Sequence, residues 1–407
     1  MNKIVILAND YPYGKIESFL ENELRFMGSV VLVSCHIGCD TEKRVPPPNV
    51  TILRPDNKFF NGNKLSMALN MALSLLRKDF WKELTSSNIR PCSIRKAFRA
   101  AKTVACAEQI TRYVRTSIKN GGPDKIVYYS YWMNHLALSA VKLADQTNGV
   151  CCSRCHGFDL YKRSDNGNYV PFQQMLLKRL DRVFPISDNG KQTILKLSDV
   201  PDISEKIQVQ RLGTDDYGEV APKGQASIFT IVSCSYVTSV KRVHLIYKAI
   251  QTITSFRIRW IHFGNGELFN ELSELITTGD SLHQIELRGY VPNREVLEFY
   301  KTNVASVFVN ASSYEGIPVS IMEALSFGIP CIAPNICGIG EIIKDGVNGF
   351  LLDPAFQAED LASVIVKMHN LDRKQYEELT RGARRVWEQD YNAENNYTKF
   401  HSILSTL

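Results

Sequence analysis

Short apolar runs alternate with longer stretches of helical periodicity along the whole chain. The runs are rich in Val and Ile, which is typical of strands buried on both faces of a parallel sheet. We predict strands at residues 4–8, 30–35, 126–131, 151–156, 183–186, 229–234, 258–263, 285–290, 305–309 and 331–333. Because the intervening stretches are long enough for helices, the pattern indicates an α/β fold with helices on both faces of each sheet.

The predicted strands fall into two sets, separated by a polar stretch rich in Pro and Gly at residues 198–224. A chain of 407 residues is also more typical of two domains than of one. We therefore predict a first domain at residues 1–195 and a second at 196–389, with the linker in the polar stretch or slightly before it. In residues 390–407, aromatic and aliphatic side chains recur at helical spacing, which predicts an amphipathic helix.

The composition is that of a globular protein, with 44% hydrophobic and 22% charged residues. No apolar stretch reaches the roughly 18 residues that a membrane-spanning helix needs, and the N-terminal run at 4–8 is too short for a signal peptide. The 10 cysteines are irregularly spaced, which favours reduced thiols and a cytosolic setting. Cys152 and Cys155 form a C-x-x-C pair, but no second pair follows at zinc-site spacing, so no metal site is expected.

Positive charge is concentrated in residues 58–119. This segment holds 13 Lys and Arg against 3 Asp and Glu, a net +10 in a chain whose total is +6. Met, Leu, Phe80 and Trp81 accompany the cations, as in helices that lie on the anionic face of a membrane. The alternative is a solvated helical face above an ordinary core stripe. We favour the membrane, and we expect no nucleic-acid partner because no recognised binding motif is present.

The most specific pattern is the stretch at residues 313–334, SYEGIPVSIMEALSFGIPCIAP. It follows a predicted strand and places Glu315 on a loop and Glu323 on the next helix. Pro318 suits the first turn of that helix, and Gly328 suits its end. Since ligands bind beyond the carboxyl ends of parallel strands, this loop is a candidate site.

Two kinds of group at this loop predict its ligand. Free backbone N–H groups at a helix N-terminus favour an anion such as phosphate. A carboxylate beside them suits sugar hydroxyls, which donate hydrogen bonds. The amides belong to Gly316, Ile317 and Val319, and the carboxylate is that of Glu315. The loop therefore predicts a ligand with both phosphate and sugar groups.

The string that begins at Glu315 is E-G-x-P-x-x-x-x-E-A-x-x-x-G-x-P-x-I-A. With this string the chain resembles the family 4 retaining glycosyltransferases, and among them the bacterial capsular, exopolysaccharide and lipopolysaccharide biosynthesis enzymes. The resemblance implies a GT-B fold, in which two Rossmann-like domains face each other across a cleft. It also implies that the first domain binds the acceptor, that the second binds the nucleotide sugar, and that the helix at 390–407 crosses back onto the first domain. The resemblance is strongest over residues 229–353.

Lys241 and Arg242 open a predicted helix in the second domain. Cations oppose the dipole at a helix start, and holding the donor diphosphate would account for them. Family members usually carry an Arg a few residues earlier, where this chain has Tyr236. The resemblance implies that Glu323 binds ribose and that the Glu315 loop holds the donor sugar. The implied donor-binding residues are Ser235, Lys241, Arg242, Gly264, Tyr290, Val291, Glu315, Gly316, Ile317, Pro318, Val319 and Glu323.

In the first domain, Gly14 and Glu17 follow the first strand, in the family loop that meets the acceptor or the diphosphate. Many relatives have a Gly-Gly pair there, so a direct diphosphate contact by this chain is in doubt. Ser18 and Glu21 are predicted to form a capping box. The stretch RCHGFDLY, residues 154–161, is similar to the family segment in which a His approaches the donor sugar.

This resemblance implies that His156 contacts the donor sugar and is a catalytic residue together with Lys241 and Glu315. Asp159 is expected to orient His156 or to bind a sugar hydroxyl, and the role of Arg154 is left open. The first-domain candidates for acceptor binding are therefore Gly14, Glu17 and Asp159.

The expected function is transfer of a sugar from a UDP- or GDP-linked donor to a glycan or lipid-linked glycan, with retention and without a metal or other cofactor. The expected location is the cytoplasm, with peripheral contact to the inner membrane. Two alternatives stay open, a GT-B epimerase that needs no acceptor and a non-catalytic nucleotide-sugar-binding subunit at the membrane.

Overall fold

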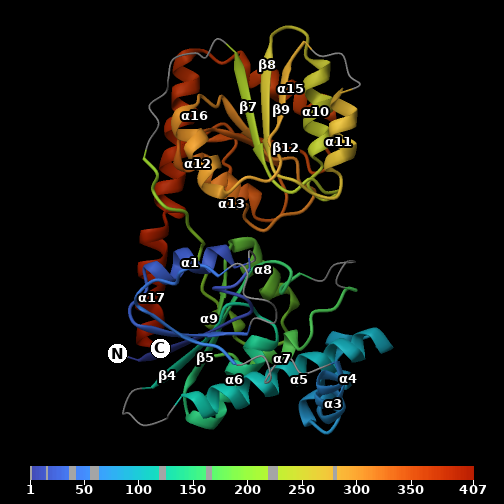
Figure 1. The fold of residues 1–407 in the computed structure, drawn as a ribbon, viewed down its shortest axis with the longest axis vertical. Coiled ribbons are helices and arrows are strands. Elements are labelled where there is room, and N and C mark those ends of the chain that lie inside the picture. Colours follow the sequence, from blue (N-terminus) through green and yellow to red (C-terminus); the bar gives the residue numbers. More distant parts are fainter. Residues whose placement is uncertain are drawn as a thin grey trace. The chain divides into compact units, whose positions relative to one another are not determined.

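The computed structural model describes residues 2–14, 17–35, 43–55, 64–118, 125–161, 167–218, 228–277 and 282–407. The chain forms two compact units (Figure 1). The first comprises Met1–Leu212 with Glu394–Leu407, and the second comprises Gly213–Ala393. Each unit contains a six-stranded sheet in which every pair of neighbouring strands is parallel. The predicted α/β fold is confirmed.

Both sheets have the same strand order relative to the chain. The first sheet runs β3-β2-β1-β4-β5-β6 and the second β12-β11-β10-β7-β8-β9, the doubly wound order of a Rossmann-like sheet. The first set of strands is β1 Lys3–Ala8, β2 Val30–Ser34, β3 Val50–Leu53, β4 Ile126–Ser130, β5 Val150–Cys155 and β6 Arg182–Pro185. The second set is β7 Phe229–Cys234, β8 Ile258–Phe263, β9 Gln284–Leu287, β10 Val307–Val309, β11 Cys331–Pro334 and β12 Gly349–Leu352.

The sequence missed two of these strands, β3 and β12, which lie at sheet edges. β3 is four residues long and none of its side chains is fully buried, so it lacks the apolar signature of a central strand. β12 begins with Gly349, a residue that ordinarily weakens a strand. Both are recruited by pairing with a neighbour, β3 with β2 and β12 with β11.

Helices connect the strands and cover both sheets. In the first unit they are α1 Ser18–Arg25, α3 Lys64–Ser74, α4 Lys78–Thr85, α5 Ile94–Ser117, α6 His135–Thr147, α7 Gln173–Arg179, α8 Asp188–Leu197 and α9 Ile203–Lys206, with the 3-10 turn Ser87–Ile89. In the second they are α10 Val243–Thr252, α11 Phe269–Thr277, α12 Asn293–Thr302, α13 Val319–Ser326, α14 Ile339–Ile342, α15 Ala358–His369 and α16 Arg373–Asp390, followed by α17 Ala393–Thr406. Within the described ranges, none of these helices combines the length and apolarity that crossing a bilayer requires.

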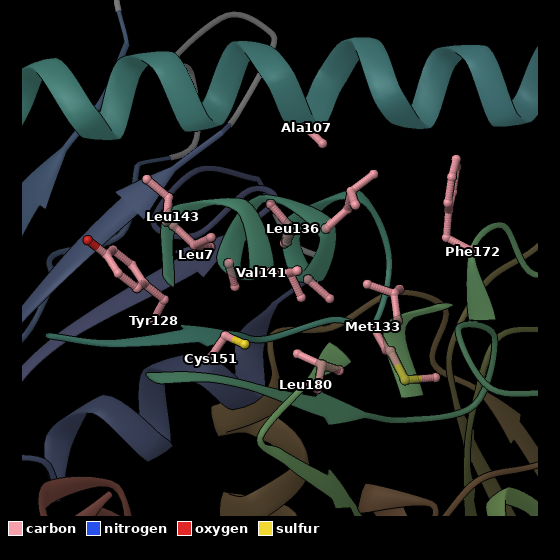
Figure 2. Packing of buried hydrophobic residues seen from close by; sticks show 14 of the residues in the cluster. Leu7, Ala107, Tyr128, Met133, Leu136, Val141, Leu143, Cys151, Phe172 and Leu180 are labelled. Atoms are coloured by element: carbon pink, nitrogen blue, oxygen red, sulfur yellow. The ribbon is translucent and has the colours of Figure 1, made fainter. Parts of the chain in front are cut away.

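Alternate residues of the first sheet enter two separate cores. Val5 and Leu7 of β1 face one cluster, which α5, α6 and α7 cover, and Figure 2 shows Ala107 of α5 above it. Ile4 and Ile6 face the other cluster, with side chains of α1 and α17. The period of two along a strand therefore sets which helices cover which face.

The boundary between the units lies at Leu212 and Gly213, later than the position predicted after residue 195. Residues beyond α8 stay with the first sheet, because the N–H groups of Gln208 and Gln210 donate to the carbonyls of Val183 and Pro185. At the other end, α17 returns to the first unit, where Phe400 and Leu404 are fully buried. The roles predicted for the two domains, acceptor binding and donor binding, stay predictions.

Helix α1 does not begin as predicted. Its N-cap is Glu17, and Ser18 lies within the helix, so the predicted capping box of Ser18 and Glu21 is wrong. The carboxylate of Glu17 turns back instead and accepts hydrogen bonds from the loop after β1. A tertiary contact therefore replaces the local cap.

A fully buried ion pair joins the elements of the first unit. Nη2 of Arg154 on β5 lies 2.9 Å from Oε2 of Glu23 on α1, and both side chains are 0% exposed. The same guanidinium donates to Tyr129 Oη at 2.9 Å and to the Gln210 carbonyl at 2.7 Å, and it lies 4.4 Å from the ring centre of Phe400 on α17. The residue whose role the sequence left open is therefore structural.

Replacing Arg154 alone tests this assignment. Arg154→Met leaves the Glu23 carboxylate buried without a counter-charge, so we expect a loss of about 3–5 kcal/mol in the free energy of unfolding. The double variant Arg154→Met with Glu23→Leu removes both charges and should recover most of that loss. Urea unfolding followed by circular dichroism measures both. A single variant as stable as the double variant would contradict the role of the pair.

Candidate functional site

The second sheet reverses its direction of winding between β7 and β10, which are neighbours although three strands apart in sequence. In doubly wound sheets, ligands bind at the carboxyl ends of the strands at such a switch point. The loops that follow these two strands are joined there. The backbone N–H and the hydroxyl of Ser313 both donate to the carbonyl of Val240, at 2.8 and 3.1 Å.

Lys241 and Glu315 form an ion pair across these two loops, between Nζ and Oε1. Both side chains are partly buried, at 24% and 14% exposure. Oε1 of Glu315 also accepts from the Ser312 hydroxyl at 2.8 Å, whereas Oε2 makes no hydrogen bond within the described chain. The structure thus brings together Lys241 and Glu315, two of the three residues that the sequence analysis predicts to be catalytic. It leaves one carboxylate oxygen able to accept a further donor.

Arg242 holds the same loop from another direction. Its Nε and Nη2 donate to the carbonyls of Ala311 and Ser312, at 2.9 and 3.2 Å, and its guanidinium lies 4.6 Å from the ring centre of Phe356. The residue is the N-cap of α10 and has a left-handed backbone, with φ of 48°. In this structure, Arg242 therefore supports the loop after β10 through hydrogen bonds to its carbonyls.

The N-terminus of α13 lies next to Glu315 in the chain. Its N-cap is Pro318, and Gly328 follows its last turn with φ of +72°, as the sequence predicts. The backbone N–H groups of Gly316, Ile317 and Val319 make no hydrogen bond within the described residues. These donors and the positive end of the helix dipole can bind an anion.

Glu323 lies on α13, where its carboxyl group is 6% exposed. Burial raises its pKa to about 7, and a 2.8 Å hydrogen bond from Asn293 Nδ2 acts in the opposite direction. A carboxyl group that can be neutral or ionised near neutral pH is a common feature of ligand sites. Asn293, at the start of α12, is a site residue that the sequence missed, because only the fold brings it to Glu323.

Two glycines of the site allow backbones to approach closely. A Cβ atom on Gly264, whose φ is +139°, would lie 1.8 Å from the carbonyl oxygen of Ser235. A Cβ on Gly338 would lie 2.6 Å from the carbonyl oxygen of Gly316. The loops after β8 and β11 therefore pack against those after β7 and β10, so Gly264 acts through backbone packing.

The remaining predicted donor-binding residues lie on the same set of loops. The Ser235 hydroxyl donates to the carbonyl of Tyr236 at 3.3 Å. Tyr290 is exposed and Val291 half-buried, both between β9 and α12. The carbonyl of Gly289 accepts from Gly264 N–H at 2.8 Å, which joins this loop to the one after β8.

In the first unit, His156 follows β5 and contacts two aromatic rings, with centroids 4.8 Å from Tyr131 and 4.4 Å from Trp132. Burial lowers the pKa of His156 to about 3, so the imidazole is neutral at physiological pH. Nε2 lies 3.0 Å from the Tyr131 carbonyl, and a carbonyl only accepts. Nε2 therefore carries the proton, and Nδ1 is the ring nitrogen left to accept a hydrogen bond.

The carboxylates of Asp159 and Glu17 both accept hydrogen bonds from backbone N–H groups. The two oxygens of Asp159 accept from the N–H groups of His156 and Met133, at 2.8 and 2.9 Å. Burial raises the Asp159 pKa to about 6. Of the two roles expected for Asp159, the structure favours that of orienting His156.

The 1% exposed carboxylate of Glu17 accepts from four N–H groups, those of Asn9, Asp10, Tyr11 and the Trp132 indole. Glu17 therefore shapes the loop after β1 and offers an acceptor sugar no exposed oxygen. Gly14, the remaining acceptor candidate, adopts a φ of +65° in that loop. The sequence could not reveal the role of Glu17, because Trp132 is far away in the chain.

Comparison with known proteins finds a family match within the second unit. Residues 225–386 match the family described as "Glycosyl transferases group 1". Over 264 residues the chain is 29% identical to WcaL of Salmonella typhimurium, whose name assigns it to colanic acid biosynthesis as a glycosyltransferase. That match covers 62% of this chain and 63% of WcaL, so the chain spans less than two thirds of this relative.

A shorter match involves an Escherichia coli enzyme named UDP-Gal:alpha-D-GlcNAc-diphosphoundecaprenol alpha-1,3-galactosyltransferase. It is 37% identical over 94 residues, which is 22% of each chain. Among solved structures, Anabaena Alr3699/HepE in complex with UDP and glucose matches over 100% of both chains, with a TM-score of 0.66 and 16% identity. The resemblance inferred from the Glu315 string is confirmed in two respects: residues 225–386 match the glycosyl transferases group 1 family, and the chain has the GT-B fold.

Proposed function

We propose that this chain is a bacterial polysaccharide-assembly enzyme that transfers a sugar from a UDP- or GDP-linked donor to a hydroxyl of a lipid-linked glycan. The observation that carries the proposal is the Lys241–Glu315 pair beside the free amides at the start of α13. A cation and N–H donors suit a diphosphate, and a carboxylate with a free oxygen suits sugar hydroxyls. The names of WcaL and of the diphosphoundecaprenol-dependent relative support the acceptor class.

In the proposed reaction, the acceptor oxygen bonds to the anomeric carbon on the face from which the diphosphate leaves. The bond between that carbon and the phosphate oxygen breaks, and the acceptor proton passes to the leaving phosphate. Lys241 and the α13 amides stabilise the charge that develops on the diphosphate. The anomeric configuration is retained, no carboxylate is needed as nucleophile, and the protein cations fill the role that a metal has elsewhere.

The other site residues bind and orient. Glu323 accepts from the ribose hydroxyls, Glu315 Oε2 accepts from the donor sugar, and the loop carrying Tyr290 and Val291 contacts the base. On the first unit, Nδ1 of the neutral His156 imidazole accepts a hydrogen bond from a sugar hydroxyl. The low pKa of His156 excludes a role as a general acid at neutral pH. The lipid-linked acceptor places the enzyme at the cytoplasmic face of the inner membrane.

Removing the Lys241 charge tests the diphosphate role. We expect UDP or GDP to raise the melting temperature of the wild type, since a ligand of the folded state must stabilise it. Lys241→Ala should weaken nucleotide binding by about 10- to 100-fold, the effect of losing one charge-assisted hydrogen bond. Thermal shift with nucleotide titration measures both.

The matched control is Lys248→Ala, which removes the same charge from an exposed position on α10, the helix that follows Lys241. It should leave the nucleotide shift unchanged. If both variants lost the same nucleotide affinity, the Lys241 effect would come from the overall positive charge of the protein and not from a contact with the diphosphate. No shift with any nucleotide in the wild type would overturn the proposed function.

The raised pKa of Glu323 gives a pH dependence without any ligand. Between about pH 4.5 and pH 7 the folded protein holds a proton that the unfolded chain has lost, so this group lowers stability as pH rises. Glu323→Gln removes that loss. Its stability relative to wild type should rise across this window, by on the order of 2–3 kcal/mol at pH above 7.

Urea unfolding of both proteins at several pH values measures the difference. A difference that stays constant from pH 4 to pH 8 would show that folding does not raise the pKa of Glu323. The same variant probes function, because ribose hydroxyls favour the ionised carboxylate. Nucleotide affinity should therefore strengthen as pH rises through 7 in the wild type more than in the variant.

A further inference from the structure

Large apolar side chains are exposed on three consecutive helices of the first unit. Leu76 after α3 is 80% exposed, Trp81 on α4 is 56% exposed and Ile94 on α5 is 91% exposed. The exposed apolar side chains of these helices and of the turn after α3 are Leu69, Leu73, Leu75, Leu76, Trp81, Ile94 and Phe98. Exposed apolar residues are usually scattered singly over a protein surface. A cluster of them is typical of an interaction site.

Helical spacing places these side chains in rows. Leu69 and Leu73 are spaced i, i+4 on the side of α3 away from Met71, which packs on the core, and Leu76 lies in the turn that follows this helix. On α5, Ile94 and Phe98 form the start of a row that continues with Lys102, which is exposed. Helices α3 and α4 both pack against α5 (Figure 1). We call the outer sides of these three helices the α3–α5 surface.

Unpaired cations surround the apolar residues. Within residues 76–102, the exposed basic side chains that make no ion pair are Lys78, Lys82, Arg90, Arg95 and Lys102. The acids offer them no partner. Asp79 pairs with Lys142 at 2.5 Å, and Glu108 pairs with Lys142 and Arg77 at 3.0 and 3.2 Å.

Glu83, the third acid, is buried, and its Oε1 accepts from Asn88, Tyr169 and the Phe172 N–H. The positive charge of the α3–α5 surface is therefore not neutralised within the described chain. The predicted cations Lys58 and Lys119 lie outside the described residues.

We propose that the α3–α5 surface docks on a membrane that contains anionic lipid. The interior of a bilayer offers its apolar side chains a nonpolar environment. Anionic headgroups at the same interface offer its cations negative charge. A second copy of this chain fits less well. A two-fold interface would bring one positively charged surface against another, so like charges would face each other. The geometry assigns Trp81 to the headgroup boundary, where indole rings gather.

This inference rests on the proposed function in one respect: an enzyme with a lipid-linked acceptor has to reach that acceptor at the bilayer. Its test does not depend on catalysis. The wild type should co-sediment with vesicles of phosphatidylcholine containing about a third phosphatidylglycerol and should remain in the supernatant with phosphatidylcholine alone. Binding should fall when salt is raised, because salt screens surface charge.

Two variants separate the two contributions. Lys78→Glu with Lys82→Glu should lower vesicle partitioning by at least about tenfold, given the attraction of each cation to an anionic surface. Leu76→Ser with Trp81→Ser should lower it by a similar factor, and both positions are exposed enough to leave folding intact. The matched control is Leu282→Ser with Val347→Ser, two exposed apolar residues of the second unit, which should bind vesicles like the wild type.

Trp81 gives a direct readout. Of the four tryptophans, Trp260 and Trp387 are fully buried and Trp132 is partly buried, so brominated lipid should quench Trp81. Quenching in the wild type and its loss in Trp81→Phe support insertion. Equal binding to neutral vesicles, or no loss in either double variant, would overturn the proposal. Concentration-dependent dimerisation that Leu76→Ser with Trp81→Ser abolishes, without vesicle binding, would assign the surface to a second copy instead.

The nucleotide thermal shift separates this proposal from the proposed function. Nucleotide binding without vesicle binding would leave the enzyme proposal standing and remove the docking surface. Vesicle binding without any nucleotide response would keep the surface and remove the transferase.

Discussion

The site depends on one ion pair, between Lys241 after β7 and Glu315 after β10. The two strands are neighbours only because the sheet is doubly wound, and the pair closes the gap between the loops that leave them. It keeps a cation and a carboxylate side by side at the helix start where amides are free. Arg242 supports the same loop through carbonyls, so its charge is used to hold shape. A ligand with adjacent phosphate and sugar groups matches this arrangement of donors and acceptors.

The first unit uses most of its buried charge for architecture. Glu17 and Asp159 both satisfy backbone N–H groups that loops would otherwise bury without partners, a situation that costs free energy. Arg154 and Glu23 connect a strand, a helix and the returning C-terminal helix in one network. Asp159 accepts a hydrogen bond from the His156 N–H, and burial together with Arg154 lowers the pKa of His156, so its imidazole is neutral. Within the stretch from Arg154 to Tyr161, Arg154 therefore serves the core and Asp159 positions His156.

Charge and apolar exposure are combined differently on the α3–α5 surface. There the acids are engaged with Lys142 or buried, and the cations are left with solvent. The exposed side chains of Leu76 and Trp81 would lower solubility on a surface without a partner. An anionic membrane would account for both the cations without acidic partners and the exposed apolar side chains.

The sequence alone determined the α/β class, ten of the strands, the positions of Glu315 and Glu323 and the cation Lys241. These follow from local apolar runs, from the residues that start and stop helices, and from one specific string. Tertiary structure decided the rest. The edge strands β3 and β12 form because a neighbouring strand pairs with them, and local pattern carries little trace of that. Glu17, Arg154 and Asn293 acquired their partners from distant segments, at Trp132, Glu23 and Glu323. The physical reason is that a polar side chain takes its role from the groups buried beside it, and folding brings those groups from elsewhere in the chain.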